Sequence, residues 1–200
     1  MSGPRAVVDR ETILAGPAQL WRGRYGISTL PDPEDVAHPL LEADGWHDCG
    51  ATDGGVTLTN NQSFFRMSVD QVADAVGQRL TERDTQVSTS LAQGTLANLA
   101  IALNHDPDEF ITEGAGYRRF TMKAGQDAFL PDELSIVLDG WAPGGNMRRR
   151  VVLYRCISIE NVESAYQKDG LWLYPVVFNA MFVDSETSPV EYVDEVALAS

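Results

Sequence analysis

The densest group of residues with ligand chemistry runs from His105 to Glu109, with Glu113 shortly after it. Carboxylate oxygens at this density are typical of calcium loops. The run lacks the glycine that makes the sharp turn at the sixth position of such a loop. We therefore interpret it as the turn at a helix exit and predict no metal site there.

Other reactive residue types are scattered. His38 and His47, like His105, fall in predicted loops, where histidine is usually solvated or hydrogen-bonded. Cys49 and Cys156 are far apart and form no Cys-x-x-Cys pair, so we expect reduced, structural thiols. The chain also lacks a nucleophile elbow, a dinucleotide or phosphate loop and a His-Glu-x-x-His motif. We expect a non-enzyme with no catalytic, metal or cofactor-binding residues.

Acidic residues dominate the charge of the chain. The 200 residues include 29 acids and 15 bases, for a net charge of -14. Such a surface repels nucleic acid, whose binding depends on lysine and arginine at phosphates, and so argues against a sequence reader. Solubility alone is one explanation of the charge. The bases, however, are concentrated in mid-chain, and Arg148, Arg149 and Arg150 form one basic patch. This segregation favours contacts between copies with opposite charges facing, and we expect the patch to meet a partner.

Hydrophobic periodicity predicts the elements that would position these residues. The period is mostly two, which predicts antiparallel strands at residues 13–21, 56–60, 62–69, 75–83, 85–91, 117–124, 133–141, 150–160 and 171–184. Near residues 94–104 an apolar stripe with helical spacing predicts one short flanking helix. The predicted fold is mainly β, an antiparallel sandwich or barrel-like domain. No signal peptide or membrane-spanning segment is predicted.

A long polar loop is predicted at residues 27–53, rich in proline and carboxylates. It also contains four apolar residues that an exposed acidic loop seldom carries: Val36, Leu40, Leu41 and Trp46. We expect this loop to become ordered by packing on a neighbouring copy.

The segment from Trp46 to Leu58, WHDCGATDGGVTL, resembles a segment of the major tail proteins, or tail tube proteins, of long-tailed, non-contractile bacteriophages. The order of elements is also similar to that family over nearly the whole chain. The resemblance implies one tail tube domain over residues 1–200. The chain departs from the family pattern at Cys49 and in its longer proline-rich loop.

The resemblance implies a structural virion protein. Its subunits would form hexameric rings whose hairpins join into an inner β-barrel, and stacked rings would make the tube for DNA ejection. Its partners would be further copies, the tape measure protein, and the tail terminator and distal tail proteins. DNA would pass without specific binding, and no cofactor or membrane is implied. The protein would reside in the virion tail, after assembly in the bacterial host cytoplasm.

The hairpin at residues 62–91 is our candidate for the inner wall, because one of its faces is rich in Gln, Ser and Thr. Carboxylates suit a DNA conduit, since bases would bind phosphates and slow transit. The candidate lumen or rim acids are Asp70, Asp74, Glu82 and Asp84.

A C-terminal arm is predicted at residues 185–200, where Val190, Tyr192 and Val193 suit an extended segment. We expect it to pack across the subunit boundary, near Arg148 to Arg150, and not on its own core. A disordered terminus is the alternative.

Two other functions fit the sequence. The inner tube of a contractile tail or injection machine would share the fold. A small ligand-binding β-barrel, or an enzyme with a dispersed site, would instead need a concave apolar pocket with converging polar groups.

Overall fold

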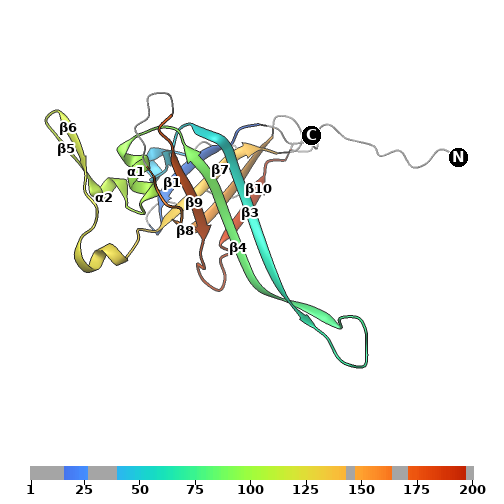
Figure 1. Ribbon diagram of the computed structural model, residues 1–200. Coiled ribbons are helices and arrows are strands. Elements are labelled where there is room, and N and C mark those ends of the chain that lie inside the picture. Colours follow the sequence, from blue (N-terminus) through green and yellow to red (C-terminus); the bar gives the residue numbers. More distant parts are fainter. Residues whose placement is uncertain (1–15, 27–39, 143–146, 164–170, 197–200) are drawn as a thin grey trace.

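The computed structural model describes residues 16–26, 40–142, 147–163 and 171–196 (Figure 1). Within these residues the chain is mainly β, with antiparallel strand pairs and short helices. The predicted fold class is therefore confirmed.

One large sheet forms the body of the molecule. Its strands are β1 (Gln19–Arg24), β2 (His47–Asp48), β3 (Thr52–Met67), β4 (Gly77–Leu91), β7 (Leu134–Trp141), β8 (Arg148–Ser158), β9 (Tyr174–Ala180) and β10 (Val190–Asp194). Their order is β2-β1-β7-β8-β9-β4-β3, and β10 also pairs with β8.

The remaining elements gather at one end of this sheet (Figure 1). They are the helices α1 (Leu96–Ala102) and α2 (Pro107–Phe110), the hairpin of β5 (Ile111–Gly114) and β6 (Tyr117–Phe120), and the 3-10 helix η3 (Gly125–Phe129). A second 3-10 helix, η2 (Glu42–Asp44), precedes β2.

The predicted helix is present as α1. Thr95 caps its N-terminus, where the side chain accepts a hydrogen bond from the Asn98 backbone N–H at 3.1 Å. Asn98 is buried as well, because its Nδ2 donates to the carbonyls of Cys49 and Gln93. These bonds join α1 to the segment before β3, so the helix closes one end of the sheet.

The core lies on both faces of β7 and β8. The runs 134–138 and 150–154 are buried at every position, so both faces of these strands are covered. The larger cluster packs Leu20, Val87 and Phe178 with one face of the central strands. A smaller cluster packs Leu40 and Trp46 against the other face.

The location of Leu40 and Trp46 corrects the expectation that they pack on a neighbouring copy. Trp46 is 1% exposed and contacts the chain's own core cluster. The turn of η2 ends at Gly45, whose left-handed φ of 81° lets the chain reverse and lay Trp46 on β7 and β8. Leu41 is 53% exposed, and Val36 lies outside the described residues.

The C-terminal arm also differs from expectation. β10, which contains Val190, Tyr192 and Val193, pairs antiparallel with β8 of its own chain. β9 pairs only with the end of β8, from Cys156 to Ser158, so the earlier part of that edge is open to β10. The predicted packing across a subunit boundary, in place of the chain's own core, is wrong for these residues.

Candidate functional site

The β3–β4 hairpin extends far beyond the sheet (Figure 1). β9 pairs with β4 only over residues 86–91, so residues 60–67 and 77–84 form a two-stranded ribbon that contacts no third strand. We call these residues the projecting ribbon. Nearly all of its side chains are exposed, on both faces. The predicted hairpin is present, and its outer half belongs to no core within the described chain.

Large apolar side chains cover much of the projecting ribbon and of the turn beyond it. Phe64 is 54% exposed and lies opposite Leu80, which is 45% exposed. The other exposed apolar residues of this region are Phe65, Met67, Val69, Val72 and Val76. Exposed apolar surface of this extent marks an interaction site in a soluble protein.

A polar strip follows one face of the same hairpin. The cross-strand pairs on this face are Thr57 with Ser88, Thr59 with Gln86, Asn61 with Asp84, and Ser63 with Glu82. Val87 lies between two of these positions and is fully buried, so the strip faces away from the core. The strip carries two acids and no base.

The four candidate acids therefore divide into two places. Glu82 and Asp84 belong to the polar strip, and the Asp84 carboxylate accepts a hydrogen bond from Gln86 at 2.8 Å. Asp70 and Asp74 lie in the turn that joins β3 and β4, where both are exposed.

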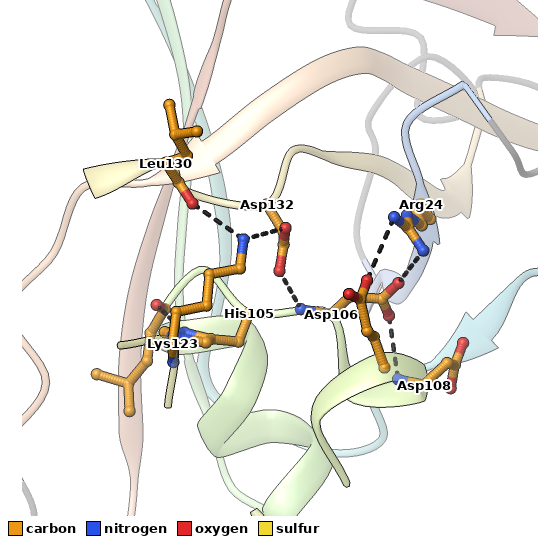
Figure 2. A network of polar contacts seen from close by, with 9 residues as sticks. Arg24, His105, Asp106, Asp108, Lys123, Leu130 and Asp132 are labelled. Carbon is orange, nitrogen blue, oxygen red and sulfur yellow. Dashed lines mark hydrogen bonds and ion pairs between the residues drawn. The ribbon is translucent and has the colours of Figure 1, made fainter. Parts of the chain in front are cut away.

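The other end of the molecule carries a lobe at residues 105–132, and a polar network fixes it to the sheet (Figure 2). Lys123 Nζ contacts the Asp132 carboxylate and donates to the Leu130 carbonyl at 3.0 Å. Asp132 Oδ2 accepts from the Asp106 backbone N–H at 2.9 Å. One lysine thus joins the segments on both sides of η3.

The second half of the network joins the lobe to β1. Asp106 is almost fully buried, caps α2 through the Asp108 backbone N–H, and pairs with Arg24 at 3.1 Å. Arg24 also pairs with Glu109 at 3.4 Å. The acidic run from His105 to Glu109 is therefore engaged by an arginine and backbone donors. Among the described residues no group of side chains is arranged to hold a metal ion.

His105 lies in the same network and acts as a positioning residue. Its Nε2 accepts from the Lys123 backbone N–H at 3.0 Å, so the proton resides on Nδ1, which donates to the Leu103 carbonyl at 2.7 Å. Phe110 and Phe120 meet its ring edge-on. Both nitrogens hold backbone groups, and the ring joins β6 to the end of α1.

We expect Asp132→Asn to loosen the lobe. The change removes the charge opposite Lys123, whose side chain is largely buried, and should lower the free energy of unfolding by roughly 1.5–3 kcal/mol. Urea unfolding and limited proteolysis within residues 111–130 measure the effect. Asp127→Asn, at an exposed position of η3, is the matched control and should stay near wild type. Equal behaviour of the two variants would contradict a fixing role for Asp132.

The predicted basic patch is used mostly within the chain. Arg150 is buried and binds Asp139 with two hydrogen bonds, at 2.7 and 2.9 Å. Arg149 binds Asp194 of β10, also with two bonds. A partner-binding role for Arg149 and Arg150 is therefore corrected, since both neutralise acids of their own chain. Arg148 lines a cavity beside β1.

The Arg149–Asp194 pair should make β10 docking sensitive to acid. The hydrogen bonds from Arg149 hold the pKa of Asp194 below its usual range. Its contribution is therefore complete above the usual aspartate pKa and is lost as pH falls through the lowered value. For a surface pair we expect about 0–1 kcal/mol.

Urea unfolding of the wild type and of Asp194→Asn should give a difference that is constant at neutral pH and vanishes in acid. Glu186→Gln changes an exposed acid whose backbone N–H alone is bonded, and serves as the control. A difference between wild type and Asp194→Asn that persists at low pH would contradict the role of this ion pair.

The cavity beside β1 has a volume of about 720 Å³ and is lined in part by Trp21, Trp141 and Asp48. The Asp48 carboxylate already accepts hydrogen bonds from Gln19 and the Gly50 backbone N–H, both at 2.8 Å. Neither cysteine is activated, because burial raises the pKa of Cys49 to about 12 and also raises that of Cys156.

No protein-family model matches the chain, and no curated protein matches it either. In the part of the chain that the structure describes, no helix has the length and apolar character needed to cross a membrane.

Proposed function

We propose that the protein is a tail tube subunit, a structural protein without catalytic activity whose copies form stacked rings around a channel for DNA. The observation that carries this proposal is the projecting ribbon, which combines exposed apolar side chains with a polar strip free of bases. The sequence resemblance to phage tail tube proteins adds to it.

The free edges of the projecting ribbon support assembly between copies. An isolated two-stranded ribbon is marginally stable in water, and its unpaired backbone groups are a template for pairing with another chain. Ribbons from several copies, paired side by side into a closed barrel, would satisfy both edges. The exposed phenylalanines would then be buried against neighbouring ribbons.

The polar strip supports the identity of the inner wall. Within a closed barrel, the strip that contains Glu82 and Asp84 would face the channel, and the opposite face would continue the subunit core at Val87. A wall of carboxylates, hydroxyls and amides holds no counter-charge for phosphate, so DNA would slide past it.

Negative-stain electron microscopy of the purified protein tests the proposal. We expect hollow tubes or rings with a central channel. A protein that stays monomeric at every concentration and holds a ligand in the cavity beside Trp21 and Trp141 would overturn the tube and favour a binding barrel. A sheath around tubes from virions would identify the contractile variant of the same function.

We further expect Glu82→Lys/Asp84→Lys to leave tubes intact while making the channel adhesive. Each lysine in the channel would bind DNA phosphates and release counterions, so DNA retention should increase and weaken with added salt. Ejection from virions, or DNA retained by purified tubes, measures the effect. Glu42→Lys/Asp44→Lys, which makes the same charge change on the exposed η2, is the control. Ejection equal to that of the control would remove these acids from the channel wall.

A further inference from the structure

Exposed apolar surfaces lie at two opposite ends of the molecule. The first is the turn at residues 68–76, at the end of the projecting ribbon, which we call the tip. The second is a patch of three residues in the lobe, Met122, Phe129 and Leu130, which we call the lobe patch. Figure 1 shows the β3–β4 hairpin and the β5–β6 lobe pointing away from the sheet in opposite directions. A single copy therefore cannot bring its own tip to its own lobe patch.

The tip is apolar and acidic. Val69, Val72 and Val76 are exposed, and the turn holds its shape through backbone bonds from Val72 to Val69 and from Val76 to Met67. Asp70 and Asp74 are exposed and make no ion pair within the described residues. The sequence of the tip contains no base.

The lobe patch is apolar and bordered by arginines. Phe129 is 85% exposed, and a cavity of about 510 Å³ opens beside Met122 and Leu130, with Phe110 among its lining residues. On the neighbouring β6, Arg119 lies over the Tyr117 ring and has no carboxylate partner in the described part of the chain. The apolar content and the charge of the lobe patch thus complement those of the tip.

We propose that the tip of one copy inserts into the lobe patch of a second copy, so that the two surfaces form the contact between successive rings. The inference rests on the proposed tube and adds the surfaces that stack it. A contact between different surfaces of identical copies does not close on itself and propagates along an axis. The network of Lys123, Asp132 and Asp106 holds the lobe in place before contact, which reduces the ordering cost of binding.

Disulfide trapping in the full-length protein tests this contact. In Val72→Cys/Leu130→Cys each copy carries one thiol on the tip and one beside the cavity of the lobe patch, while Cys49 and Cys156 are buried. Oxidation of assembled protein should give a ladder of covalent oligomers on a non-reducing gel. Val72→Cys/Tyr192→Cys keeps the tip thiol but moves the second thiol to exposed β10, and should give no ladder.

Each outcome separates this inference from the proposed function. Tubes without a ladder would overturn the tip contact and leave the tube standing. A ladder without hollow tubes would support the contact and overturn the tube. Neither tubes nor a ladder would overturn both. A ladder of equal length in the control would show nonspecific crosslinking between tips and would overturn the tip contact as well.

Discussion

Replacing Phe64 and Leu80 together with serine should abolish assembly and leave the subunit folded. The two side chains lie opposite each other on the projecting ribbon and are about half exposed in the single chain, so they contribute little to its core. Burying a large apolar side chain is worth roughly 1.5–3 kcal/mol. With half of each still to be buried, the loss is about 1.5–3 kcal/mol per subunit, which is at least a tenfold rise in the concentration needed for assembly.

Light scattering against protein concentration measures that threshold, and circular dichroism checks that the variant is folded. Ile159→Ser/Phe182→Ser is the matched control, because it removes two exposed apolar side chains that lie outside the hairpin. An unchanged threshold for Phe64→Ser/Leu80→Ser would show that the ribbon is not the assembly surface. A variant that fails to fold would show that the ribbon belongs to the subunit core.

Trp46→Ala should unfold the subunit before it affects any contact between copies. Trp46 fills the space between η2 and the second face of β7 and β8, and a cavity of that size costs about 3–5 kcal/mol. Since small domains have a total stability of only about 5–15 kcal/mol, much of the stability would be lost.

Urea unfolding measures this loss, with Trp141→Ala as the control, because Trp141 is 46% exposed. The control should lose far less stability. A Trp46→Ala protein with normal unfolding but impaired assembly would return Trp46 to a contact between subunits.

The strand content and the hairpin could be predicted from the sequence, because alternation and turn residues act over short distances. The polar strip was also predictable, since Gln, Ser and Thr recur at every second position of β4. The partner of Trp46 was not, because local sequence does not distinguish a neighbour from the chain's own sheet. A signal did exist in the continuous apolar runs of β7 and β8, which indicate strands covered on both faces.

The same limit applies to the polar contacts. Lys123 and Asp132 belong to segments predicted separately, and Arg24 is far from Asp106 in the sequence. Only the acidic run after α1 hinted at a network there. The pairing of β10 with β8 was hidden because it depends on β9 leaving part of that edge open, which is a property of the whole sheet.

The pairing of β1 with β7 has a consequence for the synthesis of the protein. Gln19 pairs with Asp139, so the sheet cannot close until nearly three quarters of the chain has been made. The β3–β4 hairpin joins residues close in sequence and can form much earlier. Nascent chains would therefore display an adhesive apolar hairpin while the rest of the sheet is still incomplete, a state prone to aggregation. Slow production at low temperature, or chaperones that shield Phe64 and Phe65, should raise the soluble yield.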